Sequence, residues 1–120
     1  MAKSIITEIG SIVPEFKEEK VIILFGPMAT PDLRDICVIH EFHQKPVHAL
    51  TVGTQFSLGK HKYTITQVGC DANKNFEELG HISIYFKDDY NEILPGAITV
   101  QPDIFPDLNV GDDINFELEL

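Results

Sequence analysis

The chain has 120 residues and a formal net charge of −10 at pH 7, from nine basic and nineteen acidic side chains. That length corresponds to one domain, and a hydrophobic content of 43% excludes a disordered chain. The acidic balance argues against a nucleic-acid-binding protein and against binding to an anionic membrane surface, because both need positive charge.

Short apolar runs, separated by Gly, Pro and Asp, predict a chain built mostly from β-strands. Taken in chain order, the predicted strands are residues 4–13, 21–25, 37–42, 55–58, 61–65, 81–86, 97–100 and 114–120. Residues 15–19 predict a charged loop or one helical turn, and residues 31–36 predict a short helix with Pro31 at its first position. Residues 71–79 predict a second short helix or an ordered loop, ended by Gly80.

The alternation within the strands predicts which side chains share a face. Ile5, Thr7 and Ile9 are expected on one face of the first strand. The inward residues of the last strand are expected to be Ile114, Phe116, Leu118 and Leu120.

Tight turns between strands, such as Gly59-Lys60, predict antiparallel pairing, and closing the sheet removes its exposed edges. The sequence therefore predicts an all-β fold in a single domain, residues 1–120. The expected architecture is a small antiparallel barrel or barrel-like sandwich of about eight strands with one or two short helices.

Histidine is the residue type that stands out, because three of the five histidines lie within nine residues: His40, His43 and His48. One interpretation is a zinc-binding module that uses Cys37, His40 and His43. On a strand, residues three apart point to opposite faces, so this module needs the strand to break near Phe42. The other interpretation is a single histidine that accepts a phosphoryl group, since a neutral imidazole nitrogen is nucleophilic near pH 7.

His40 is the candidate for such an acceptor. In a strand it shares a face with Val38 and Phe42, while Glu41 points to the other side, where its charge repels a phosphoryl group least. The acceptor role requires one ring nitrogen open to solvent at a docking surface and the other held by a hydrogen bond. The spacing alone favours a different interpretation, in which His40 is a buried, hydrogen-bonded residue of the barrel core.

Several sequence blocks make the chain similar to a known family. They are Pro31-Asp32-Leu33, Cys37-Val38-Ile39-His40, Gln55-Phe56-Ser57-Leu58-Gly59, Glu78-Leu79-Gly80-His81, Pro95-Gly96 and Gly111. In their order and spacing they resemble the glucitol/sorbitol-specific IIA component of the bacterial phosphoenolpyruvate-dependent sugar phosphotransferase system. The resemblance covers nearly the whole chain, and it implies an all-β, barrel-like fold.

The resemblance implies a phosphotransferase component with a phosphohistidine intermediate, acting as a phosphoryl carrier in sugar-alcohol uptake. The family's Cys-x-Ile-His pattern falls on residues 37–40, which implies that His40 is phosphorylated. The implied donor is the histidine-containing phosphocarrier protein, and the implied acceptor is a cysteine of the IIB part of the IIB/IIC membrane permease. No cofactor, metal, nucleic acid or membrane insertion is expected.

Two further histidines are weaker site candidates. His81 lies in a matched block, so it is a candidate for orienting His40 or binding phosphoryl oxygens, with a plain strand-start residue as the alternative. His43 is the second candidate, although its spacing from His40 departs from the family's pattern.

The start of the chain shows no signal-peptide core, and the longest apolar run, residues 21–25, is too short to span a bilayer. We therefore expect a cytoplasmic protein in which Cys37 and Cys70 are reduced. A non-catalytic β-barrel interaction domain stays open beside the phosphoryl carrier and the zinc module.

Overall fold

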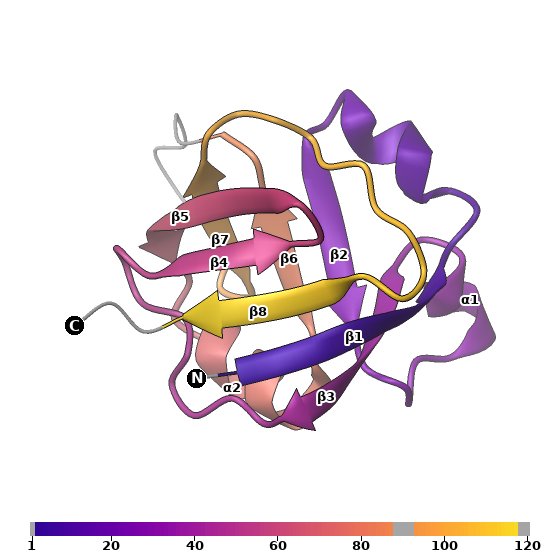
Figure 1. Cartoon of the computed structure of the whole chain (residues 1–120), viewed down its shortest axis with the longest axis horizontal. Helices are drawn as coiled ribbons and strands as arrows, with labels where there is room; N and C mark the ends of the chain where they lie inside the picture. Colours follow the sequence, from indigo (N-terminus) through magenta and orange to yellow (C-terminus); the bar gives the residue numbers. More distant parts are fainter. Residues whose placement is uncertain (1, 88–92, 118–120) are drawn as a thin grey trace.

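The structure, a computed structural model, describes residues 2–87 and 93–117. In this part of the chain eight strands close into a barrel in the order β1-β3-β2-β6-β7-β5-β4-β8 (Figure 1). The strands are β1 (Ala2–Ile9), β2 (Val21–Phe25), β3 (Val38–Gln44), β4 (Gln55–Leu58), β5 (His61–Val68), β6 (Ile82–Tyr85), β7 (Ala97–Gln101) and β8 (Asp113–Glu117). The helical elements are the 3-10 helix η1 (Val13–Lys17) and the α-helices α1 (Pro31–Arg34) and α2 (Ala72–Leu79). The predicted eight-stranded barrel is confirmed.

The direction of strand pairing differs from the prediction at two places. Of the eight interfaces between the described strands, six are antiparallel, whereas β2 pairs with β3 and β6 with β7 in parallel. Parallel neighbours need a long crossover connection rather than a hairpin. Residues 26–37, which include α1, connect the first pair, and residues 86–96 connect the second. The barrel is therefore mixed, with antiparallel pairing wherever the connection is a tight turn.

The predicted hairpin turn and the predicted end of the second helix are confirmed. Gly59, with a φ of +59°, and Lys60 form the two-residue turn between β4 and β5, where Leu58 pairs with His61. Helix α2 ends at Gly80, whose φ of +66° is the left-handed conformation that favours glycine. Helix α1 is shorter than expected. Among the described residues no helix has both the length and the apolar character needed to cross a membrane.

The first strand differs from the prediction in its end and in its faces. It ends at Ile9, and its buried residues are Ala2, Ser4 and Ile6. A register shift between Ile6 and Glu8 then reverses the alternation, so that Ile9 packs against the core. The expectation that Ile5, Thr7 and Ile9 share one face is therefore wrong. Ser4 is on the same inward face as Ile6, so a polar side chain lies inside the barrel.

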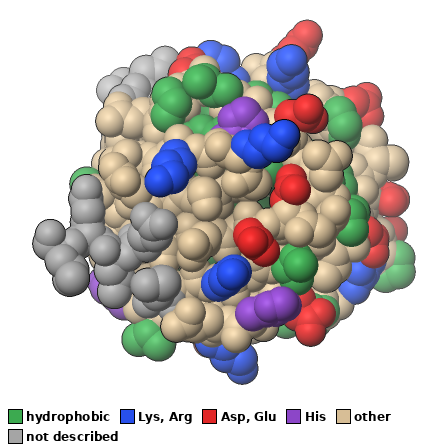
Figure 2. Space-filling view, viewed as in Figure 1, with side chains coloured by type: hydrophobic (Ala, Val, Ile, Leu, Met, Phe, Trp, Pro, Cys, Tyr) green, Lys and Arg blue, Asp and Glu red, His purple; other side chains and the backbone are tan. Residues whose placement is uncertain are grey.

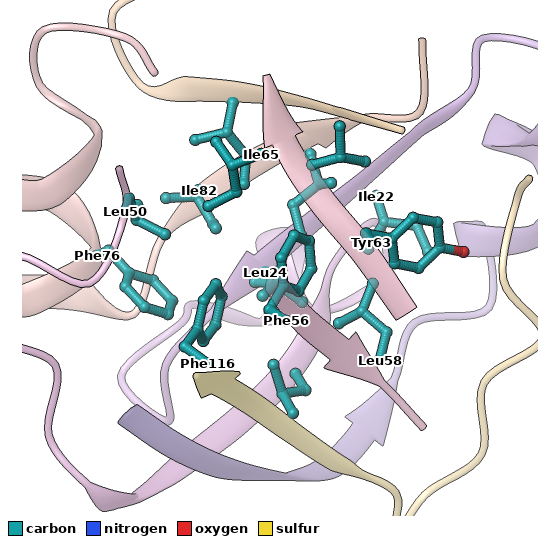
Figure 3. Packing of buried hydrophobic residues seen from close by; sticks show 14 of the residues in the cluster. Ile22, Leu24, Leu50, Phe56, Leu58, Tyr63, Ile65, Phe76, Ile82 and Phe116 are labelled. Carbon is teal, nitrogen blue, oxygen red and sulfur yellow. The ribbon is translucent and has the colours of Figure 1, made fainter. Parts of the chain in front are cut away.

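Aromatic and branched side chains fill the barrel interior (Figure 3). The rings of Phe56 and Phe116 stack with centroids 4.8 Å apart, and Phe76 packs edge-on against Phe116 at 5.3 Å. Phe76 comes from α2, so this helix covers one end of the barrel. In β8 the predicted inward residues Ile114 and Phe116 are buried, while Leu118 and Leu120 lie outside the described residues.

The negative charge is not gathered into one region of the face seen in Figure 2. Acidic and basic side chains are interspersed there, and hydrophobic side chains are exposed in small, separate groups. This distribution is typical of a solvated surface, so a specific site has to be found from local geometry.

Candidate functional site

His40 lies in β3 with its side chain inside the barrel and no exposed surface. Both ring nitrogens are occupied: Nδ1 lies 2.8 Å from Ser4 Oγ, and Nε2 lies 2.7 Å from the carbonyl oxygen of Gly80. The rings of Phe42 and Phe76 pack against the imidazole at centroid distances of 5.0 and 5.9 Å. The expectation of a ring nitrogen open to solvent is therefore wrong for this conformation, because α2 and Gly80, the residue that follows it, cover the end of the barrel.

The two hydrogen bonds determine the tautomer of His40. A carbonyl oxygen only accepts, so Nε2 carries the proton and donates to Gly80. Burial lowers the pKa of His40, and the hydrogen bond to Gly80 opposes this effect only in part. The ring is therefore neutral near pH 7, its Nδ1 has a lone pair, and the Ser4 hydroxyl donates to it. A neutral imidazole is the protonation state that nucleophilic chemistry needs.

The backbone of Gly80 and Gly26 lies close to Nε2 of His40. A Cβ atom at Gly80 would lie 3.1 Å from that nitrogen and 3.1 Å from the backbone nitrogen of Gly26. Gly26 is held there because its N–H donates to the carbonyl of Leu79 at 2.8 Å. Gly26 and Gly80, together with Phe42, also help to line a surface pocket of about 290 Å³. The charged residues around the pocket are Glu41, Lys45, Glu77 and Glu78.

The other two candidate histidines lie elsewhere around this end of the barrel. The ring of His81 stacks on Phe25 at 4.7 Å, on the outer side of the barrel, and partial burial there lowers the pKa of His81. Its backbone, which directly follows Gly80, is the part that lies near His40. His43 is exposed on β3, and in the described part of the chain nothing hydrogen-bonds its ring. The structure thus does not bring the three rings together.

The zinc-binding alternative is wrong on geometry. The strand does not break near Phe42 but continues to Gln44, with a register shift where Phe42 pairs with Ser4 and Gln44 pairs with Lys3. Cys37 packs beside Ile39 in a small cluster outside the barrel, where burial raises the pKa of its thiol to about 11. His40 points inward and His43 lies on the surface. Within residues 2–87 and 93–117, no three side chains of the metal-binding types lie close enough to hold an ion.

Two partners of His40 were not predicted from the sequence. Ser4 lies two residues before Ile6 and shares its inward face, a position that the predicted face of Ile5, Thr7 and Ile9 does not indicate. Gly80 was predicted as the end of a helix, and nothing local indicates that its carbonyl meets a residue forty positions away.

The neutral state of His40 predicts how stability depends on pH. Its pKa in the folded protein lies below the ordinary value of 6.5, so between these two values the unfolded chain binds a proton that the folded protein does not. This contribution to stability is fully present above pH 6.5 and is lost as the pH falls toward the folded pKa. Relative to His40→Gln, we expect the free energy of unfolding of the wild type to fall by up to about 1.4 kcal/mol per pH unit below 6.5.

Urea unfolding of both proteins at several pH values between 5 and 8 measures this difference. The lowered pKa of His81 has the same sign but is present in both proteins, so its effect cancels. Parallel stability curves for the wild type and His40→Gln would contradict a buried, neutral His40.

The sequence and the barrel are both similar to those of known proteins. A family model described as "PTS system glucitol/sorbitol-specific IIA component" matches residues 1–115. Two proteins named PTS system glucitol/sorbitol-specific EIIA component, from Shigella flexneri and Escherichia coli (strain K12), are each 38% identical over 113 residues, which cover 93% of this chain and 90% of theirs. The crystal structure of a PTS system IIA component from Enterococcus faecalis V583 has a TM-score of 0.91 and 31% sequence identity, covering 97% of this chain and 99% of that chain.

Proposed function

Because this chain belongs to the glucitol/sorbitol-specific IIA family of the phosphotransferase system, we propose that it accepts a phosphoryl group on His40 during sugar-alcohol uptake and passes it on. Membership of the family supports the phosphoryl carrier role. The Cys-x-Ile-His pattern at residues 37–40 supports His40 as the acceptor. The donor is the histidine-containing phosphocarrier protein, and the next acceptor is a cysteine of the IIB component of the IIB/IIC permease.

The observation that carries the proposal is the environment of the His40 ring. The ring is neutral, its Nδ1 is held by Ser4, and its Nε2 donates to the carbonyl of Gly80, a residue that also lines a surface pocket. An acceptor histidine needs one nitrogen fixed and the other directed toward the donor. His43, by contrast, is exposed, and nothing in the described residues orients its ring.

Phosphorylation of Nε2 requires the carbonyl of Gly80 to move away, because that oxygen lies 2.7 Å from the nitrogen. Nε2 then gives up its proton to water while Nδ1 takes a proton up from water, and the lone pair now on Nε2 attacks the phosphorus of the donor's phosphohistidine. The phosphorus–nitrogen bond to the donor breaks, and its electron pair stays on the donor's ring. In the next step a cysteine thiolate of the IIB component attacks the same phosphorus, and Nε2 of His40 leaves with the electron pair. Catalysis consists mainly of positioning the two partners in line.

The charges around the pocket favour a donor with a basic docking face. Three carboxylates, those of Glu41, Glu77 and Glu78, surround it with a single amine, that of Lys45. The whole chain has the same sign, with a formal charge of −10. Complementary charge speeds the encounter of two proteins and sets their orientation, so it suits a short-lived relay complex.

A phosphorylation assay tests the proposal. With phosphoenolpyruvate and the two general relay proteins, we expect an acid-labile, base-stable label on the wild type and on His43→Ala, and only background label on His40→Gln. Glutamine retains a donor and an acceptor for Gly80 and Ser4, and circular dichroism checks that the variant is folded.

The outcomes separate the alternatives. Full labelling of His40→Gln would show that His40 is not the acceptor. Loss of label in His43→Ala instead would move the acceptor to the outer face of β3. A folded wild type that takes no label would favour the non-catalytic interaction domain over a phosphoryl carrier.

A further inference from the structure

We infer that Ser4 is a positioning residue of the phosphoryl transfer, whose hydroxyl holds His40 in both of the tautomers that the transfer needs; the inference rests on the proposed role of His40. Ser4 is 2% exposed and lies on β1, the strand that pairs with β3. Its Oγ is 2.8 Å from Nδ1, and no other side chain in the described residues hydrogen-bonds the ring.

In this structure the His40 ring is in the tautomer whose Nε2 cannot act as the nucleophile. That nitrogen carries the proton it donates to Gly80, so it has no lone pair to offer, while the lone pair at Nδ1 faces Ser4. Attack by Nδ1 would require a phosphoryl group to displace Ser4 inside the barrel. Attack by Nε2 requires only that the Gly80 carbonyl moves and that the proton is on Nδ1.

A hydroxyl suits this exchange because it both donates and accepts. In the resting ring, Ser4 donates to Nδ1. When the Gly80 carbonyl moves away and water reaches the ring, the Nε2 proton passes to one water molecule and Nδ1 takes a proton from another, so the ring stays neutral. The Nδ1–H then donates to Ser4 Oγ after a rotation of the hydroxyl hydrogen alone. A carboxylate in the place of Ser4 would only accept, and it would bring a second buried negative charge toward the incoming phosphoryl group.

The position of Ser4 indicates that it affects the transfer step and not the docking of the donor protein. Its side chain is inside the barrel beneath the His40 ring, whereas a donor protein approaches from the pocket beyond Gly80. Loss of the hydroxyl is therefore expected to slow the transfer step and to leave the affinity for the donor unchanged.

The test compares Ser4→Thr with Ser4→Val, two side chains of the same shape that differ in the hydroxyl. At saturating donor, we expect Ser4→Val to accept the phosphoryl group about ten-fold more slowly than the wild type, as the loss of one buried hydrogen bond predicts. Ser4→Thr is expected to stay within about two-fold of the wild type because it keeps the donor and acceptor. The KM for the phosphorylated donor is expected to be the same in all three proteins.

Nitrogen-15 NMR of the His40 ring gives a readout that a purely structural role would not change. We expect the proton on Nε2 in the resting wild type and, after phosphorylation of Nε2, on Nδ1.

A phosphoryl group found on Nδ1 would overturn the inference, as would equal transfer rates for Ser4→Thr and Ser4→Val. If His40→Gln is labelled like the wild type, the proposed function itself fails; if His40 is the labelled residue and the two Ser4 variants are equal, only the role of Ser4 fails.

Discussion

Replacing Phe76 by alanine is expected to lower the free energy of unfolding by about 3–5 kcal/mol, the range for truncating a large aromatic residue in a core. Phe76 has no exposed surface, and its ring contacts those of Phe42, His40 and Phe116 at centroid distances of 5.2, 5.9 and 5.3 Å. Only Ala72 and Phe76 are buried in α2, so Phe76 is the one large side chain that attaches this helix to the barrel.

The same substitution is expected to loosen the cover over His40. Without the Phe76 ring, α2 loses its main contact with the core, and Gly80, which follows the helix, is held less firmly over Nε2. Hydrogen–deuterium exchange of the amides of Gly80 and His81 should therefore become faster, because both donate to carbonyls of α2.

Urea unfolding with Phe76→Leu as the control measures the stability effect. Leucine fills more of the space than alanine, so this variant should lose only about 1–1.5 kcal/mol. Phe105→Ala is a second control, because Phe105 is partly exposed and contacts Phe86 instead of His40. A loss of less than about 1.5 kcal/mol for Phe76→Ala would show that α2 is held by something other than this ring.

The features that the sequence predicted well depend on local geometry. Alternation along β3 correctly placed Val38, His40 and Phe42 on one face, because successive residues of a strand point to opposite sides regardless of the rest of the fold. Gly59 and Gly80 were recognised as a turn and a helix end for the same reason, since each needs a positive φ.

The features that were missed depend on contacts between distant segments. An inward residue near the end of a barrel is open or closed according to what covers that end, and here the cover is α2 with the Gly80 carbonyl. Parallel pairing of β2 with β3 likewise depends on the path of the connection through α1, which alternation does not describe. The inward position of Ser4 was hidden because the register shift after Ile6 made Ile9, and not Ile5, the core residue.

Replacing Gly80 by alanine is expected to destabilise the protein by about 2–3 kcal/mol and to slow the proposed phosphorylation of His40. About half of this loss comes from forcing an alanine into the left-handed conformation, φ +66°. The rest comes from crowding, since the new Cβ atom would lie 3.1 Å from Nε2 of His40 and 3.2 Å from Cα of Gly26. Neither neighbour moves easily, because the imidazole is buried and the Gly26 N–H is bonded to Leu79.

Gly111→Ala is the matched control. Gly111 also has a positive φ, +97°, but a Cβ atom there would meet nothing within 4 Å. Its substitution should therefore show the conformational cost alone, about 1–2 kcal/mol, and leave the labelling rate of His40 unchanged. The difference between the two variants in urea unfolding measures the crowding around His40. Equal losses, with equal labelling rates, would mean that Gly80 does not confine the imidazole and that the path to Nε2 lies elsewhere.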